Sequence, residues 1–249
     1  MRVFVLTGAG VSAESGLGTF RNKERTGIWA RFDPMKLATP EAFARDPETV
    51  RAFYNARRRN LINAAPNAAH AALARLEAGL AARGSRLTLV TQNIDDLHER
   101  AGSQRVIHMH GELLKARCGR CEFVSPRRDD IGADSQCAGC RRAGTLRPHV
   151  VWFGEIPLEM EVICAALAQA DLFVAIGTSG AVYPAAGFVA IARRAGAAAC
   201  EINLEPSDNA DQFDARRYGR ASQEVPAWVE EMLGARPDNR AAPATRSTG

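Results

Sequence analysis

The feature that most constrains this chain is a glycine-rich turn directly after a short apolar stretch. Residues 2–6 have the apolar character of a buried strand, and residues 8–13, which read GAGVSA, fit the pattern G-x-G-x-x-[GA]. Such a turn lets backbone amides and a helix N-terminus approach a pyrophosphate, so it predicts a dinucleotide site. A dehydrogenase would place an acidic residue about 20 residues further on. Residues 27–30 read GIWA instead, which disfavours hydride transfer.

Short apolar runs alternate with helical stretches along the rest of the chain. Residues 87–91 are apolar and bounded by polar turns, which is typical of a buried parallel strand. Asp46 followed by Pro47 is typical of a helix start with Asp46 as N-cap. The alternation predicts an α/β fold, a Rossmann-like doubly wound parallel sheet. Strands are expected at 2–6, 87–91, 106–108, 172–176 and 198–202, and helices within 41–62 and at 68–83, 157–169, 185–194 and 225–233.

The composition is that of a globular enzyme, with 249 residues of which 46% are hydrophobic and 24% charged. The net charge of +4 comes from 32 basic and 28 acidic residues that are interspersed, so no direct nucleic-acid partner is expected. The apolar N-terminal stretch is too short for a signal peptide. No apolar run approaches the roughly 18 to 20 residues that span a bilayer. We expect a cytoplasmic monomer with no membrane partner.

Four of the six cysteines are paired by their spacing. They follow the pattern C-x₂-C-x₁₅-C-x₂-C, which is typical of a tetrahedral Zn²⁺ site, and one ion per chain is expected. Four thiolates leave no open coordination position, so this zinc should be structural; a redox CxxC is the alternative, which two pairs disfavour. The predicted ligands are Cys118, Cys121, Cys137 and Cys140. Cys164 and Cys200 are expected to pack in the apolar interior.

These observations give a domain organisation. Residues 1–235 form one catalytic domain, in which residues 1–30, 85–111 and 148–235 belong to the large Rossmann-like part. A small zinc-binding domain is inserted, with a helical part at about 31–84 and a zinc module at about 112–147. Residues 236–249, rich in Arg, Pro and small polar residues, are expected to form a disordered tail.

Two polar groups are candidates for chemistry. Gln92, Asn93 and Asp95 follow a predicted strand, where ligands bind in doubly wound sheets, although Asn and Asp also cap helices. His110 has the titration range of a general base at neutral pH. His108, two residues earlier on the same face of a strand, is the competing candidate and is expected to be a packed neighbour.

Five blocks of the sequence, in the same order, resemble the signature motifs of the sirtuin family. The resemblance runs from the first residues to about Pro226. The blocks are residues 8–17 and 19–21 (GAGVSAESGL, TFR), 91–98 (TQNIDDLH), 110–113 (HGEL), 177–179 (GTS) with Val182 and Pro184, and 201–206 (EINLEP).

The resemblance implies an enzyme that removes acyl groups from lysine side chains of proteins and consumes NAD, giving nicotinamide and O-acyl-ADP-ribose. His110 is implied as the base that deprotonates a ribose hydroxyl, and Asn93 and Asp95 as binding NAD and a water. The implied NAD contacts are Gly8, Ala9, Gly10, Ala13, Glu14, Thr19, Phe20, Arg21, Gln92, Asn93, Asp95, Gly177, Thr178, Ser179, Asn203, Leu204, Glu205 and Ala221.

Tyr54 and Arg57 are three residues apart in a predicted helix, so they lie on one face. An Arg fork beside a phenol suits a carboxylate. The pair resembles the sirtuin class that removes succinyl, malonyl and glutaryl groups; a solvated basic face, and hence a plain deacetylase, is the alternative. The segment 147–155 resembles the strand with which the family binds its peptide substrate. The expected partner is therefore an acylated protein, and the implied contact residues are Val151, Phe153, Gly154 and Glu155.

One segment departs from the family pattern. Residues 22–28 are longer and more charged than the loop expected between the nucleotide and the acyl pocket. Two other functions remain open: mono-ADP-ribosyl transfer from the same NAD site, and a binding module in which the zinc part grips a nucleic acid or protein. The second predicts salt-dependent association without nicotinamide release.

Overall fold

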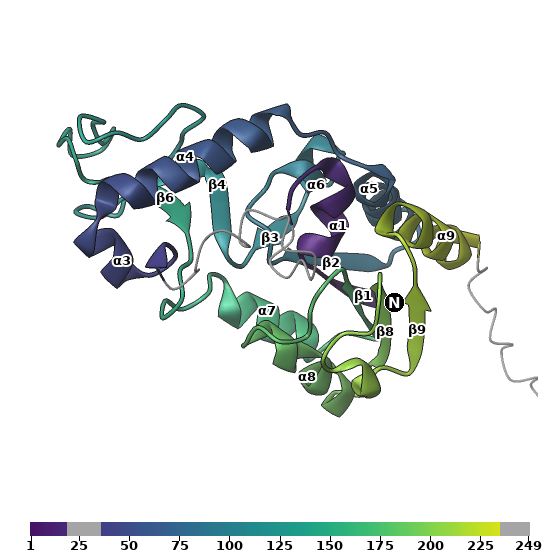
Figure 1. Ribbon diagram of the computed structural model, residues 1–249. Helices are drawn as coiled ribbons and strands as arrows, with labels where there is room; N and C mark the ends of the chain where they lie inside the picture. The colour runs from purple at the N-terminus through teal and green to yellow at the C-terminus, as the bar shows by residue number, and fades with distance from the viewer. Residues whose placement is uncertain (19–35, 235–249) are drawn as a thin grey trace, which may run out of the picture.

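The computed structural model describes residues 1–18 and 36–234. Six strands form a parallel sheet with the order β3-β2-β1-β7-β8-β9, and three strands form a small antiparallel sheet with the order β5-β4-β6 (Figure 1). The strands are β1 (Arg2–Thr7), β2 (Arg86–Thr91), β3 (Val106–His108), β4 (Gly111–Cys118), β5 (Val124–Pro126), β6 (Leu146–Val150), β7 (Leu172–Ile176), β8 (Ala198–Asn203) and β9 (Ala215–Tyr218).

Helices cover both faces of the parallel sheet, as a doubly wound fold requires. Among the described residues the helices are α1 (Ala9–Ser12), α3 (Pro40–Arg45), α4 (Pro47–Asn63), α5 (Ala68–Ala81), α6 (Leu97–Arg100), α7 (Met160–Leu167), α8 (Phe188–Arg194) and α9 (Ala221–Gly234). None of the helices in these ranges has the length and apolar character needed to cross a membrane.

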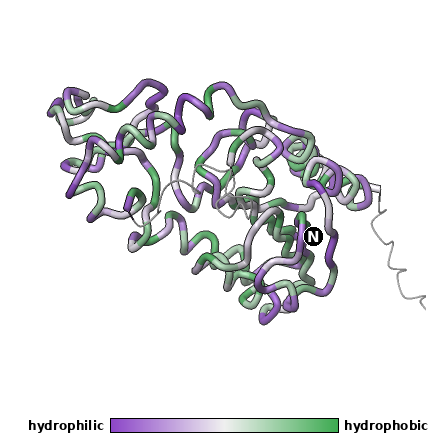
Figure 2. Tube along the Cα trace, in the orientation of Figure 1, coloured by the Kyte–Doolittle hydropathy of each residue, from purple (hydrophilic) through white to green (hydrophobic). Residues whose placement is uncertain are grey.

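The alternation of side chains along β1 explains the two layers. Val3 and Val5 point into a cluster with α5 and α9, whereas Phe4 and Leu6 point into a cluster with α7 and α8. Successive residues of a strand face opposite sides, so a strand buried on both faces has a continuous apolar run. Figure 2 shows this hydrophobic colouring concentrated in the strands of the parallel sheet.

Several helix starts differ from the predictions. Asp46 is the N-cap of α4, as predicted, and accepts from the Thr49 N–H at 3.0 Å. However, α7 begins at Met160 and not at residue 157, because Glu159 has a left-handed backbone (φ 58°) that a helix cannot include. Helix α9 begins at Ala221, four residues before the predicted start, and contains Pro226. In place of one helix over 185–194, a 3₁₀ turn precedes α8.

The prediction for Cys164 was wrong. Ile163 and Leu167 form the buried face of α7, and Cys164 is exposed because it is one residue away from that face. Cys200 is buried on β8, as expected. Strands β4, β5 and β9 were not predicted, because β9 reads ARRY and because β4 and β5 lack the continuous apolar run of a strand that is buried on both faces. The predicted tail at 236–249 and the unusual segment 22–28 lie outside the described residues.

Candidate active site

A cavity of about 1060 Å³ opens at the carboxyl ends of β1, β2 and β7. In the sheet, β2 lies beside β1 on one side and β7 lies beside β1 on the other, so the strand order reverses direction at β1. The cavity is at this switch point, where doubly wound folds bind ligands. Helix α4 and residues around β6 supply the opposite wall. This volume exceeds that of most single-ligand pockets, which leaves room for a dinucleotide and a second substrate.

Every predicted cofactor-binding, catalytic or substrate-binding residue in the described ranges lines this cavity. Thr19, Phe20 and Arg21 lie outside those ranges. The cavity therefore unites Gly8, Ala9, Gly10, Ala13, Glu14, Tyr54, Arg57, Gln92, Asn93, Asp95, His110, Val151, Phe153, Gly154, Glu155, Gly177, Thr178, Ser179, Asn203, Leu204, Glu205 and Ala221.

The glycine-rich turn is packed against the end of β7. The Gly10 N–H donates to the Gly177 carbonyl at 2.9 Å, and Gly177 has a left-handed backbone (φ 63°). A Cβ atom added to Gly8 would lie 2.7 Å from the Gly177 oxygen, and one added to Gly10 would lie 2.7 Å from the Gly177 Cα. Side chains are therefore excluded from both sides of this contact, which lets a ligand approach the backbone of the turn closely.

Ser12 connects the polar residues at the end of β2. Its hydroxyl donates to Asp95 Oδ2 at 3.0 Å and accepts from Asn93 Nδ2 at 3.1 Å. Asn93 Nδ2 also donates to the Gly8 carbonyl at 3.1 Å. Asp95 is buried, which raises the pKa of its carboxyl. The Asn and Asp of the predicted block are thus fixed to the glycine-rich turn through Ser12.

Two buried histidines extend this network. The Asn67 N–H donates to His70 Nδ1 at 3.2 Å, so a neutral His70 carries its hydrogen on Nε2 and donates to Ser12 Oγ at 3.3 Å. His98 Nε2 lies 3.0 Å from the Thr7 hydroxyl, and its ring packs against His70. Burial lowers the pKa of His70 to about 4 and that of His98 to about 3, so both are neutral at pH 7. Neither histidine was predicted as a site residue, although His98 ends the block 91–98.

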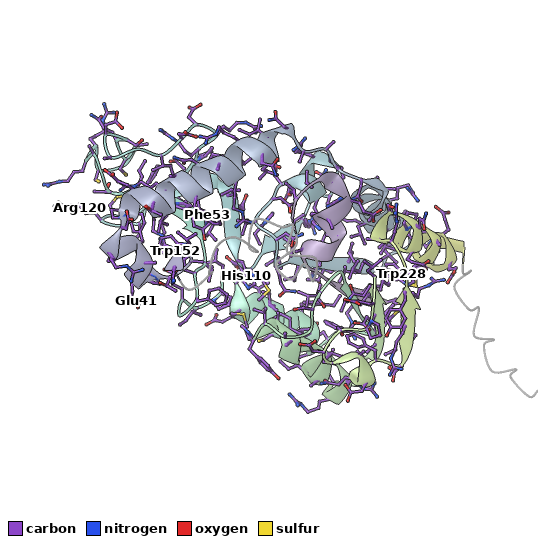
Figure 3. The ribbon with its side chains drawn as sticks, viewed as in Figure 1. Glu41, Phe53, His110, Arg120, Trp152 and Trp228 are labelled. Atoms are coloured by element: carbon purple, nitrogen blue, oxygen red, sulfur yellow. The ribbon has the colours of Figure 1, made fainter. Side chains whose placement is uncertain are left out.

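His110 lies on the crossover from the parallel sheet to the small sheet, between the end of β3 and the start of β4 (Figure 3). Its Nδ1 is 2.9 Å from the Gln92 carbonyl oxygen. A carbonyl only accepts, so Nδ1 carries the hydrogen and Nε2 keeps its lone pair. Burial lowers the pKa of His110, which keeps the imidazole neutral and able to accept a proton.

His108 is in a different environment, as predicted. It does not line the cavity, and its Nε2 is 2.6 Å from the Glu99 carboxylate. Burial lowers the pKa of His108, but the Glu99 carboxylate more than offsets this and the net shift is upward. His110, and not His108, therefore presents its imidazole to the cavity.

Tyr54 and Arg57 reach the cavity from α4. Tyr54 is buried (2% exposed), and its hydroxyl oxygen accepts from Trp152 Nε1 at 2.9 Å. Burial raises the pKa of Tyr54, so the hydroxyl keeps its hydrogen. The Arg57 guanidinium is half-buried and lies over the Tyr54 ring, 5.9 Å from its centroid. Together they place one cation and one neutral hydroxyl at this end of the cavity.

The segment after β6 closes the same wall. Strand β6 is an edge of the small sheet and ends at Val150, so the residues predicted to bind peptide follow the strand. The Val151 N–H donates to the His110 carbonyl at 2.9 Å. Glu155 is held by Arg147 through two hydrogen bonds of 2.7 and 2.9 Å, and its pKa is lowered because this pairing outweighs its burial.

Polar contacts also join the turns on the other side of the cavity. Asn203 Nδ2 donates to the Thr178 carbonyl at 2.7 Å. The Glu14 carboxylate accepts from the Ser222 N–H at 3.0 Å and from the Ser222 hydroxyl at 2.6 Å, so it caps the start of α9. This contact explains why α9 begins before its predicted start.

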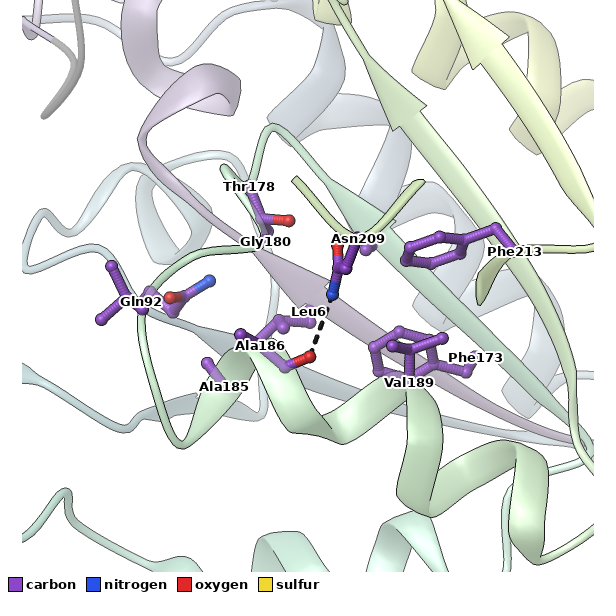
Figure 4. A pocket seen from close by; sticks show the side chains of 12 residues that line it. Leu6, Gln92, Phe173, Thr178, Gly180, Ala185, Ala186, Val189, Asn209 and Phe213 are labelled. Atoms are coloured by element: carbon purple, nitrogen blue, oxygen red, sulfur yellow. Dashed lines mark hydrogen bonds between the residues drawn. The ribbon is translucent and has the colours of Figure 1, made fainter. Parts of the chain in front are cut away.

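A second, much smaller cavity lies behind Gln92 (Figure 4). Its volume of about 10 Å³ has room for no more than about one water molecule. The Asn209 amide donates to the Ala186 carbonyl at 2.9 Å across its edge. It is too small for a substrate, so the chemistry belongs to the large cavity.

The four predicted metal ligands meet in the small sheet. Their sulfur atoms all lie within 4.8 Å of one another, with Cys118 to Cys140 at 3.8 Å and Cys121 to Cys137 at 3.6 Å. A tetrahedral site with Zn–S bonds of 2.3 Å has S···S edges of about 3.8 Å, so the cluster fits Zn²⁺. No cysteine of this cluster lines the large cavity, which agrees with a structural ion.

Comparisons with known proteins identify the family. Residues 8–184 match the Sir2 family. An NAD-dependent protein deacylase of Caulobacter vibrioides is 65% identical over 233 residues, covering 94% of this chain and 97% of the relative. One from Escherichia coli (strain K12) is 56% identical over 234 residues, covering 93% and 82%. The crystal structure of a Sir2 homolog–NAD complex superposes with a TM-score of 0.81 at 40% identity, covering 93% and 90%.

The fold, the cavity and these likenesses agree with one another. A match over residues 8–184 includes the glycine-rich turn, the polar residues after β2, His110 and the four cysteines. The chain belongs to the Sir2 family, the sirtuins.

Proposed function

We propose that this protein is an NAD-dependent protein-lysine deacylase that prefers acidic acyl groups, succinyl and malonyl, over acetyl. The observation that carries the proposal is that one cavity is lined by the glycine-rich turn, by His110 and by the Tyr54 and Arg57 pair. A dinucleotide, a general base and an acyl carboxylate can therefore be held at the same place.

His110 is the proposed general base. Its Nδ1–H is fixed on the Gln92 carbonyl, so the lone pair on Nε2 is available to take a proton from a ribose hydroxyl. When bound, NAD supplies the electrophilic sugar carbon to which the acyl oxygen adds as nicotinamide leaves. The deprotonated hydroxyl then attacks the acyl carbon, the lysine nitrogen leaves as the free amine, and one water adds at that carbon, so that the acyl group ends as an ester on ADP-ribose.

The remaining polar residues bind and orient. Ser12 fixes Asn93 and Asp95 beside the glycine-rich turn, which suits the nicotinamide ribose. Gly8, Ala9 and Gly10 let the phosphates approach the backbone of the turn closely, although the N–H groups of Gly8 and Gly10 already donate to the carbonyls of Ile176 and Gly177. The residues near the ends of β7 and β8 are proposed to hold the adenosine half: Gly177, Thr178, Ser179, Asn203, Leu204, Glu205 and Ala221.

The acyl preference rests on charge. A succinyl or malonyl group ends in a carboxylate, which can pair with the half-buried Arg57 and accept from Tyr54. A charge-assisted contact of this kind is worth roughly 1.5–3 kcal/mol, or about tenfold to a hundredfold in affinity. An acetyl group lacks the carboxylate, so it gains nothing from either residue.

The test is nicotinamide release with NAD and two peptides that differ only in carrying acetyl-lysine or succinyl-lysine. We expect the native chain to favour succinyl, Arg57→Met to reduce the succinyl-to-acetyl ratio of kcat/KM at least tenfold, and His110→Tyr to abolish release with both peptides. Arg59→Met is the matched control, because Arg59 lies on the same helix but pairs with Asp130 away from the cavity.

Each other outcome has a clear meaning. If acetyl is favoured and Arg57→Met leaves the ratio unchanged, the protein is a plain deacetylase and the acidic-acyl proposal is wrong. Label from NAD that remains on a protein, in place of O-acyl-ADP-ribose, would favour ADP-ribosyl transfer. If neither peptide gives nicotinamide, the deacylase proposal itself fails.

A further inference from the structure

The hydroxyl of Tyr54 has a defined direction because of its partner. Trp152 Nε1 lies 2.9 Å from the Tyr54 oxygen, and an indole nitrogen only donates. The hydrogen of a phenol lies near the plane of its ring, on one of two sides. Trp152 occupies one of those sides, so the Tyr54 hydrogen must point to the other and acts as a donor there.

Trp152 itself is held from several directions. The Arg147 guanidinium stacks on its ring, 3.4 Å from the centroid, and Glu155 accepts from the Trp152 backbone N–H at 2.8 Å. Arg147 and Glu155 are joined to each other by two hydrogen bonds, and the Phe43 ring lies 5.3 Å from the Trp152 ring. The indole is only 2% exposed, so it cannot turn its N–H away from Tyr54.

Core packing alone does not account for this arrangement. Trp152 belongs to the hydrophobic cluster beside the cavity, where any large aromatic ring would supply apolar contact. What an indole adds is one N–H group, and that group is bonded to the hydroxyl of Tyr54, which lines the cavity together with Arg57. The polar edge of Trp152 therefore acts on the acyl end of the cavity through Tyr54.

We propose that Trp152 is a positioning residue that determines acyl selectivity, because its indole N–H fixes the Tyr54 hydroxyl as a donor toward an acyl carboxylate. The inference rests on the proposed preference for acidic acyl groups. It assigns part of the selectivity to a relay of four residues, in which Arg147 and Glu155 clamp Trp152 and Trp152 orients Tyr54. It predicts that selectivity falls although both carboxylate-binding side chains are still present.

The test is a double-mutant cycle with Trp152→Phe, Tyr54→Phe and the double variant, assayed with the succinyl and acetyl peptides. Losing an ordered hydrogen bond of this kind should lower the succinyl-to-acetyl ratio of kcat/KM roughly fivefold. The loss should appear in KM for the succinyl peptide, with KM for NAD unaffected. In the Tyr54→Phe background, Trp152→Phe should cause no further change in the ratio.

Phe is smaller than Trp, so a second variant separates shape from hydrogen bonding. Site-specific incorporation of 3-benzothienylalanine at position 152 replaces the N–H by sulfur and keeps the bicyclic ring. The ratio should fall as in Trp152→Phe. The proposal is overturned if this variant keeps the native ratio, or if the effects of Trp152→Phe and Tyr54→Phe add.

The two proposals can fail separately. If Tyr54→Phe lowers the ratio while both Trp152 variants keep it, the acidic-acyl function stands and the role of Trp152 is wrong. If the native chain shows no succinyl preference and Tyr54→Phe changes nothing, the acidic-acyl function is wrong and the role of Trp152 falls with it.

Discussion

The two sheets are stabilised by different means. In the described part of the chain, the parallel sheet lies between two clusters of 17 and 16 buried hydrophobic residues. The small antiparallel sheet shares a cluster of 11 such residues with α4 at its cavity end, but the cluster at its zinc end has five, and two of these are the metal ligands Cys118 and Cys137. Apolar burial contributes roughly 1.5–3 kcal/mol for each large side chain, so the parallel sheet has ample stabilisation of its own.

The zinc end of the small sheet depends on coordination. Its five-residue cluster offers little apolar area, whereas four thiolates that meet around one Zn²⁺ tie the loop ends of β4 and β6 together. Both sheets border the cavity, so the site joins a region that folds by hydrophobic burial to a region that folds by binding metal. The two regions should respond differently to the same perturbation.

Removal of zinc should have the largest effect. A structural zinc site contributes on the order of 10 kcal/mol to the region that it folds, so a chelator or Cys137→Ser should unfold the zinc end of the small sheet. Hydrogen exchange followed by mass spectrometry should show rapid exchange in β4 and β6 while β1, β2 and β7 remain protected. Uniform exchange across both sheets would mean that they form one cooperative unit.

A core substitution tests the other region. Leu76 on α5 is fully buried in the cluster beneath the parallel sheet, so Leu76→Ala should lower the free energy of unfolding by about 2–5 kcal/mol. Urea denaturation measures this, and elemental analysis should show an unchanged zinc content. Val162→Ala, at an exposed position of α7, is the control and should change stability by less than about 0.5 kcal/mol. Loss of zinc from Leu76→Ala would contradict the claim that the two regions are stabilised by different means.

Low pH should reduce the free energy of unfolding, because two histidines are buried beside the parallel sheet. The pKa values of His70 and His98 are about 4 and about 3 in the folded protein, whereas unfolded histidine titrates near 6.5. The unfolded state therefore binds more protons below pH 6.5, and stability falls as pH drops from there toward 4, by up to about 1.4 kcal/mol per pH unit for each histidine. Urea denaturation between pH 4.5 and 8 gives the free energy of unfolding at each pH. This free energy should fall less steeply with decreasing pH in His70→Gln than in the native chain, and an equally steep fall would contradict the prediction.

The smallest effect is expected at the contact between α4 and the zinc module. Arg59 and Asp130 pair on the surface, where their side chains are 59% and 53% exposed. Such pairs contribute about 0.2–1 kcal/mol and weaken with salt. Arg59→Ala should therefore lower the free energy of unfolding by less than about 1 kcal/mol at low salt and by almost nothing at 1 M salt. A larger decrease in the free energy of unfolding that persists at 1 M salt would mean that this contact contributes to stability by more than a surface ion pair.

The two sheets also show which features of the structure can be predicted from the sequence. The strands around the cavity were predictable because a strand buried on both faces is a continuous apolar run, as in residues 172–176. The zinc ligands were predictable because knuckle geometry fixes the spacing of cysteines. Asp46 was predictable because capping is a local interaction.

Interactions between distant segments were not predictable. Helix α9 starts early because Glu14, 208 residues before Ser222 in the sequence, accepts from its N–H and hydroxyl. His70 looked like an ordinary helical residue, although its place three residues after the cap Asn67 was a usable signal. The bond from Trp152 to Tyr54 joins residues 98 apart, and neither neighbourhood indicates it.

The close contact among Gly8, Gly10 and Gly177 has a consequence for anyone who tries to evolve this protein. At each position the smallest residue is already present, and an added Cβ atom would meet backbone of another of the three or of its neighbour. A damaging change at one of them therefore has no second-site suppressor at the other two, because none can become smaller. In a selection for altered nucleotide use, these three codons should stay invariant while variation accumulates around the adenosine half, where side chains can still be exchanged.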